Sequence, residues 1–161
     1  MSGKGQPTSL ELQLQALRPG DHLCCLFESE ADLFPVALPF ARHGFERGEK
    51  VLFRLEPATT RAVLEGLETG GLEPASARDR GQLVVAAVSG CRGVAEAREA
   101  DEAIAWLAGE SRAAAREGYP ALRVCVELGA RPGAGGLRRQ VEYDTRLGGF
   151  LAQKRCCPLT R

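Results

Sequence analysis

The segment His22-Leu-Cys-Cys-Leu-Phe27 is a short apolar run that follows a turn at Arg18-Pro-Gly-Asp21. A run of this length between polar segments is typical of a strand that is buried on both faces. From Ser29, placed as the N-cap, apolar residues recur at steps of three and four, which predicts a helix. We expect Pro39 to kink this helix or delay its start, and Gly48 to end it.

The same alternation of strand and helix continues along the chain. Further strands are predicted at 51–55, 82–88 and 122–128, with a fifth beginning near 155, and helices after Pro57, over about 94–118 and from 137 to about 154. Such alternation predicts a three-layer α/β fold, in which a mostly parallel sheet has helices on both faces. Residues 9–17 carry too little pattern to distinguish a helix from a strand. We expect 1–15 to be a flexible tail and 16–161 to be one domain.

The composition indicates one globular domain without a strong charge preference. Hydrophobic residues make up 44% of the 161 residues, enough to bury a core at this size. The 21 basic and 21 acidic residues cancel, so no broad field attracts nucleic acid or anionic lipid. No apolar run approaches the roughly 20 residues of a membrane span, and no signal peptide is evident. We therefore expect a cytoplasmic protein that binds neither nucleic acid nor membrane directly.

The cysteines are expected to be free thiols in that compartment. The chain has six, none of them in a C-x-x-C pair: Cys24, Cys25, Cys91, Cys125, Cys156 and Cys157. Neighbouring Cys-Cys pairs are not the spacing of a disulfide framework, and a zinc site would have to be assembled from distant segments. We predict neither a metal site nor a cofactor.

Parallel sheets bind ligands beyond the carboxyl ends of their strands, so the strand ends are the first place to look for a site. A nucleotide-binding protein would have the phosphate loop G-x-x-x-x-G-K-[ST] after the first strand, whereas this chain has Glu28-Ser-Glu-Ala-Asp32. Three carboxylates there would repel a triphosphate. No catalytic motif is present either, and we predict a protein that is not an enzyme.

The densest group of reactive side chains is His22, Cys24 and Cys25. Alternation along a strand places His22 and Cys24 on one face and Cys25 on the other. A neighbouring histidine could lower the pKa of a thiol or share a soft metal with it. The alternative is that all three are ordinary core residues, since a buried cysteine behaves as a small apolar side chain.

Other polar candidates have equally plain alternatives. Glu127 lies in an apolar strand, where a carboxylate lines a cavity, reaches solvent or pairs with Arg54. Trp106 is expected to pack rather than to stack on a ligand. The segment Glu142-Tyr-Asp144 is interpreted as a solvated helix face, and the glycine-rich 129–136 as a plain loop.

Several segments resemble the MEDS domain, a sensory module named from methanogens and methylotrophs and from a dichloromethane-responsive regulator. The resemblance covers about residues 18–157 and is carried by Asp21-His-Leu-Cys-Cys-Leu-Phe-Glu-Ser-Glu30, Pro39–Phe53, Arg80-Gly-Gln-Leu-Val-Val85, Glu117–Val124 and Val141-Glu-Tyr-Asp-Thr-Arg-Leu147. It implies a fold like that of RecA and KaiC-type ATPases without the phosphate loop. It also implies sensing of small metabolites, some derived from hydrocarbons, with His22 and Cys24 at the positions proposed to contribute.

The C-terminal segment departs from the family pattern. Where relatives continue with Tyr-Asp and a further helix, this chain reads Cys156-Cys-Pro-Leu-Thr-Arg161, and we expect an incomplete sheet edge. No output domain is evident, so a signal must pass through a regulatory or signalling partner. We predict a small-molecule sensor whose ligand binds near His22, Cys24, Arg54 and Glu127. The alternatives are a degenerate nucleotide-binding domain and a thiol or metal switch that uses Cys24.

Overall fold

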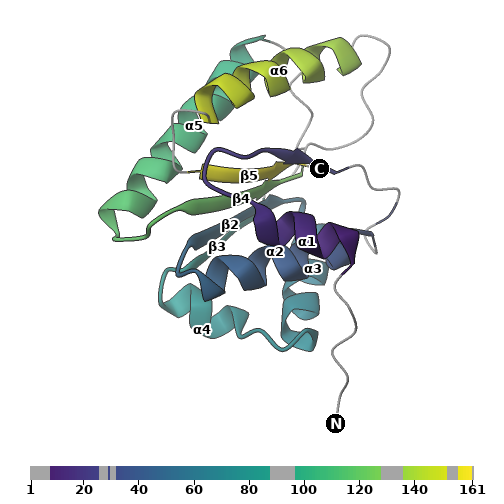
Figure 1. Cartoon of the computed structure of the whole chain (residues 1–161), viewed down its shortest axis with the longest axis vertical. Coiled ribbons are helices and arrows are strands. Elements are labelled where there is room, and N and C mark those ends of the chain that lie inside the picture. The colour runs from purple at the N-terminus through teal and green to yellow at the C-terminus, as the bar shows by residue number, and fades with distance from the viewer. Residues whose placement is uncertain are drawn as a thin grey trace.

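A computed structural model describes residues 8–25, 29, 32–87, 97–127, 136–151 and 156–160 (Figure 1). Its helices and strands alternate along most of the chain. In order they are α1 (Ser9–Ala16), β1 (Leu23–Cys24), α2 (Phe34–Glu46), β2 (Lys50–Leu55), α3 (Pro57–Thr69), α4 (Pro74–Asp79), β3 (Leu83–Ala87), α5 (Ala97–Arg116), β4 (Leu122–Val126), α6 (Gly136–Leu151) and β5 (Cys156–Thr160).

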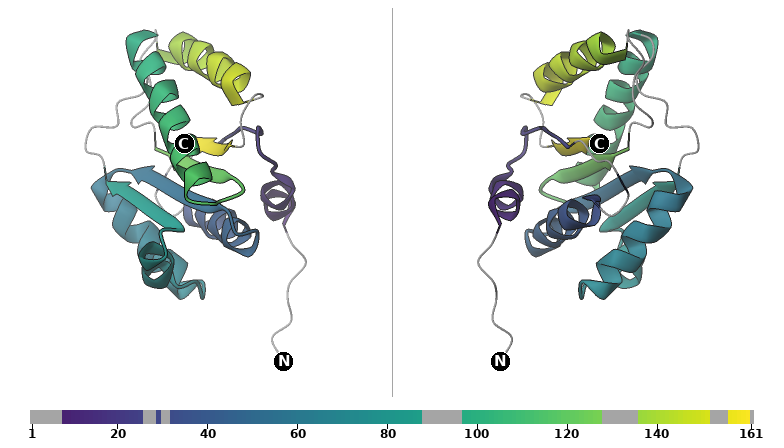
Figure 2. Two further views of the ribbon diagram at one scale, coloured as in Figure 1. Left: turned by 90° about the vertical axis from the view of Figure 1, so that its left-hand side faces the viewer. Right: turned by 90° about the vertical axis from the view of Figure 1, so that its right-hand side faces the viewer.

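The five strands form one sheet in the order β1-β5-β4-β2-β3, and every pairing is parallel. Helices cover both faces, with α5 and α6 on one side and α1 to α4 on the other (Figures 1 and 2). This is the three-layer α/β fold that the alternation predicts. The strand predicted from residue 155 is confirmed as β5, which pairs with β1 on one side and β4 on the other.

Alternation along the central strands divides the core into two layers. Val51, Phe53 and Leu55 of β2 pack toward α1 to α4, whereas Leu52 packs toward α5 and α6. The first layer is completed by Leu14, Phe40, Leu67, Ala77 and Cys125, and the second by Leu107, Leu122, Val124, Leu147 and Leu151. Because both faces are covered, these strands read as continuous apolar runs in the sequence.

The N-terminal segment differs from the flexible tail that we predict over residues 1–15. Thr8 caps α1 with a reciprocal capping box, in which its hydroxyl accepts from the Glu11 amide and the Glu11 carboxylate accepts from the Thr8 amide. Leu14 is fully buried in the first core layer. The folded part therefore includes residues from Thr8 onward, and residues 1–7 lie outside the described part.

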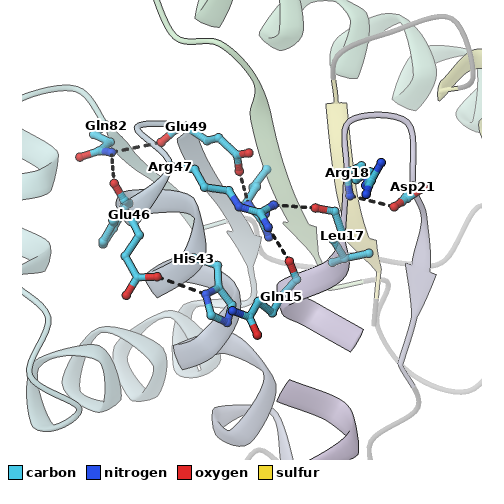
Figure 3. A network of polar contacts seen from close by, with 11 residues as sticks. Gln15, Leu17, Arg18, Asp21, His43, Glu46, Arg47, Glu49 and Gln82 are labelled. Carbon is cyan, nitrogen blue, oxygen red and sulfur yellow. Dashed lines mark hydrogen bonds and ion pairs between the residues drawn. The ribbon is translucent and has the colours of Figure 1, made fainter. Parts of the chain in front are cut away.

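Arg47, directly after α2, ties α1 to the rest of the fold. Its guanidinium donates to the carbonyl oxygens of Leu17 and Gln15, at 2.7 and 2.5 Å (Figure 3). These carbonyls at the end of α1 have no partner within the helix, so the arginine satisfies acceptors that would otherwise need water. The contact holds the segment that leads into β1.

The predicted start of α2 is wrong, and its end is confirmed. Leu33, not Ser29, is the N-cap, and the Ser29 amide and hydroxyl instead donate to the Asp32 carboxylate. Pro39 is accommodated inside the helix, which runs on to Glu46. Gly48 follows the helix with φ +67°, a conformation that favours glycine.

Candidate functional site

The strand register places two of the predicted site residues in one row across the sheet. Cys24 pairs with Thr160, Thr160 with Val126, and Val126 with Arg54. Residues in one row of a parallel sheet point to the same face, which here is the face covered by α5 and α6. The row lies at the carboxyl end of the strands. Three strand spacings separate Cys24 from Arg54, or about 14 Å between Cα atoms.

Arg54 lies over the ring of Trp106 from α5, with its guanidinium carbon 4.9 Å from the ring centroid. Both side chains are half-buried, and Trp106 packs against the second core layer. This agrees with the prediction that Trp106 packs. Within the described residues, Arg54 has no carboxylate within ion-pairing distance.

Helix α6 brings Tyr143 and Asp144 to the same side of the sheet. Tyr143 is only 5% exposed, and its burial, assisted by the negative charge of Asp144, raises the pKa of its phenol to about 12; the positive charge of Arg54 acts in the opposite direction. The phenol therefore keeps its proton at neutral pH and can donate a hydrogen bond.

The negative charge of Asp144 also acts on His22, which lies just before β1. Burial lowers the pKa of His22 below its ordinary value, and the Asp144 carboxylate partly opposes that shift. His22 is half-buried, and its lowered pKa favours the neutral imidazole at neutral pH. Arg54, Tyr143, Asp144 and His22 thus form an electrostatically linked group between the sheet and α6.

The two neighbouring cysteines lie on opposite faces, as alternation predicts. Cys25 is half-buried against the first core layer, and its burial, followed by the nearby Cys24, raises the pKa of its thiol. Cys24 is exposed and lies in the row that contains Arg54. Only Cys24 is therefore placed on the same face as the α6 residues.

The side chain of Glu127 is held at the start of α3. Its carboxylate accepts a hydrogen bond of 3.1 Å from the amide of Glu56, the N-cap of α3, and its own amide donates to the Arg54 carbonyl at 2.9 Å. The carboxylate thus contacts the start of α3, a helix that covers the face of the sheet opposite the Arg54 side chain. The structure thus places Cys24 and Arg54 on one face of the sheet, about 14 Å apart, with His22 on that face by alternation, and it places the Glu127 carboxylate at the start of α3.

Tyr143 and Asp144 were not predicted as site residues from the sequence. The interpretation of Glu142-Tyr-Asp144 as a solvated helix face holds for the exposed Glu142 but is wrong for Tyr143, which is buried. The spacing of Tyr143, Leu147 and Leu151 at steps of four was a signal that this tyrosine lies on the core-facing side of α6. The predicted loop at 129–136 falls almost wholly outside the described residues.

The donor set does not resemble a metal site within the described part of the chain. There, no three His, Cys, Asp or Glu side chains come close enough to hold a metal ion. The group instead combines a guanidinium, a neutral imidazole, a phenol and a carboxylate beside an indole ring. Such a combination of a few polar groups in an apolar layer is typical of small-molecule recognition.

Comparison with known proteins identifies the family of the chain. No described helix has both the length and the apolar character needed to cross a membrane. Comparison with curated proteins gives no significant match. A family profile, described as the methanogen/methylotroph, DcmR sensory domain, matches residues 21–159. This match includes every strand of the sheet except the last residue of β5, and the chain therefore belongs to the MEDS family of sensory domains.

Proposed function

We propose that this domain binds a small metabolite at the carboxyl end of the sheet, on the face covered by α5 and α6. Binding changes its affinity for a regulatory or signalling partner, and no reaction is catalysed. The observation that carries the proposal is the electrostatically linked group of His22, Arg54, Tyr143 and Asp144 in an otherwise apolar layer.

The energetic argument is that placing ionisable groups in such a layer costs free energy, so their presence there favours a functional role. The rest of this layer is filled mainly by apolar side chains, among them Leu52, Val124 and Leu147. Ionisable groups that gather at the strand ends of a parallel sheet, with pKa values shifted by burial, are candidates for ligand contacts. Membership of a sensory family supports the same interpretation.

The surroundings also favour a ligand with a substantial apolar part. Trp106 and the aliphatic side chains offer apolar contacts, while the polar groups fix orientation. A metabolite derived from a hydrocarbon has this combination. Glu127, held at the start of α3, is proposed to contribute from the other side of the strand ends.

The first test is native mass spectrometry of the gently purified protein. We expect a retained small molecule in the wild type and its loss in a His22→Ala, Cys24→Ala double variant. The matched control is His43→Ala, Cys25→Ala, because His43 lies on α2 and Cys25 packs toward the opposite face. A bare mass for the wild type, or equal retention by both double variants, contradicts the proposed site.

The proposed partner is tested by affinity capture from the cells that make the protein. Wild type and the His22→Ala, Cys24→Ala variant are compared in parallel, and a regulatory or signalling protein should be recovered in different amounts with the two. Identical recovery contradicts signalling through that site. The proposed compartment is the cytoplasm, where thiols such as those of Cys24 and Cys25 stay reduced.

A further inference from the structure

The guanidinium of Arg54 differs from those of the other sequestered arginines. Three arginines are buried or half-buried in the described part of the chain: Arg42, Arg54 and Arg123. Arg42 donates to the Gly70 carbonyl at 2.8 Å, and Arg123 donates to the Glu49 carboxylate. Arg54 has the Trp106 ring but no hydrogen bond or ion pair to an oxygen among the described residues.

With respect to the described residues, this arrangement leaves the N–H donors of the Arg54 guanidinium available to a ligand. The five N–H groups of a guanidinium lie in its plane and match the two oxygens of a carboxylate in a bidentate geometry. An aromatic ring stabilises the charge but accepts none of these N–H groups as an oxygen would. A half-buried guanidinium at the end of a central strand is thus suited to an anionic ligand.

The neighbouring groups restrict the charge of that anion. The protonated phenol of Tyr143 is a second donor on the same side of the sheet, and the charge of Arg54 acts on it. Asp144 contributes a negative charge to the same group. Because the charges of Arg54 and Asp144 largely offset one another, the site does not compensate the desolvation of a phosphate dianion, and a ligand with a single negative charge fits better.

We propose that Arg54 binds the carboxylate of a small organic acid, whose apolar part lies against Trp106 and to which Tyr143 donates a second hydrogen bond. This inference rests on the proposed sensory function and names the class of ligand for the same site. It adds Trp106 and Tyr143 as binding residues.

The test uses Trp106 as a reporter, because it is the only tryptophan in the chain. Its fluorescence is followed while the protein is titrated with sodium acetate and sodium hexanoate, at constant ionic strength maintained with sodium chloride. We expect saturable changes, with tighter binding of hexanoate because of its longer apolar chain. Hexanamide, the uncharged analogue, and inorganic phosphate should bind at least about tenfold more weakly.

The variants separate the carboxylate contact from a purely structural role of the arginine. Arg54→Gln should weaken hexanoate binding at least about tenfold, and Arg54→Lys by less, because it keeps the charge. Arg61→Gln, an exposed arginine on α3, is the matched control and should bind like the wild type. Tyr143→Phe should weaken binding by a smaller factor, of about three to ten.

Three outcomes overturn the proposal: no binding of either carboxylate, equal binding of hexanamide and hexanoate, or wild-type affinity in Arg54→Gln. Thermal unfolding shows whether Arg54→Gln has a folding defect. If it has, hexanoate binding by Arg54→Lys is compared with that of the wild type instead. Native mass spectrometry distinguishes failure of the carboxylate proposal from failure of the proposed sensory function. If a molecule retained by the wild type is also retained by Arg54→Gln, the sensor stands and the carboxylate contact falls.

Discussion

Arg123 of β4 donates from Nε to the carboxylate of Glu49, and both side chains are buried between α2 and the sheet. The guanidinium also lies over the ring of Phe40, with its carbon 5.4 Å from the centroid. Its two terminal nitrogens are buried and have no hydrogen-bond partner in the part of the chain that the structure describes. Glu49 is therefore the group that compensates a fully buried positive charge.

Removing that carboxylate should destabilise the fold strongly. We expect Glu49→Ala to lower the free energy of unfolding by about 3–5 kcal/mol, because an uncompensated guanidinium stays buried. Urea unfolding followed by circular dichroism measures the change. The control is Glu46→Ala, whose exposed carboxylate contacts His43 and should contribute less than about 1 kcal/mol. Similar losses for both variants would contradict the assigned role of the buried pair.

The glycine that faces this ion pair leaves no room for a side chain. A Cβ atom at Gly44 would lie 2.6 Å from Cγ2 of Val51 and 2.9 Å from Cδ of Arg123. We expect Gly44→Ala to destabilise the protein by about 1–3 kcal/mol through overpacking. Gly109, inside α5, has open space at the same position, so Gly109→Ala should stabilise by about 0.5–1 kcal/mol. Thermal unfolding of the two variants should shift in opposite directions.

His22 should make the stability depend on pH in the weakly acidic range. Because burial lowers its pKa in the folded state, the unfolded chain binds the proton first as the pH falls. Stability from the neutral imidazole is fully present above the unfolded value of about 6.5 and is lost as the pH falls toward the lower folded value. Unfolding titrations of wild type and His22→Gln across this range should diverge toward acid. Parallel curves would contradict the burial of a neutral imidazole.

The two adjacent thiols should differ in reactivity. Cys24 is exposed, whereas Cys25 is half-buried with a raised pKa and therefore a smaller thiolate fraction. Alkylation with iodoacetamide at neutral pH, read out by peptide mapping, should modify Cys24 first. In denaturant the two rates should converge. Preferential modification of Cys25 in the folded protein would contradict the strand alternation.

The strand and helix pattern could be predicted because it depends on local periodicity. Apolar runs such as 51–55 and 122–128 identify β2 and β4, and glycines such as Gly48 and Gly70 mark helix ends. The start of α2 was misplaced because Ser29 has the chemistry of an N-cap, but its hydroxyl bonds to Asp32 outside the helix. Helix α4 was missed because six residues are too few to show a period.

The grouping of site residues could be predicted only in part. That His22 and Cys24 share a face follows from alternation within one strand. Arg54 lies on the same face, whereas Glu127 lies at the start of α3. These positions depend on strand order and on register, which the local sequence pattern does not reveal. Tyr143 and Asp144 belong to α6, whose position over the sheet depends on tertiary packing. Because the neighbouring residues are polar, the local sequence did not indicate that the phenol of Tyr143 is buried.

The position of β5 has a consequence for how the chain folds. This strand follows the other four in sequence, yet it lies inside the sheet, between β4 and the edge strand β1. Until it has emerged from the ribosome, β1 has no neighbour to pair with, and the row that contains Cys24 and Arg54 cannot form. Pairing the first strand with the fifth also closes a long loop, which raises contact order and slows folding. The ability to bind the proposed ligand should therefore arise late, after synthesis of β5, while α2, β2, α3 and β3 can already associate during translation.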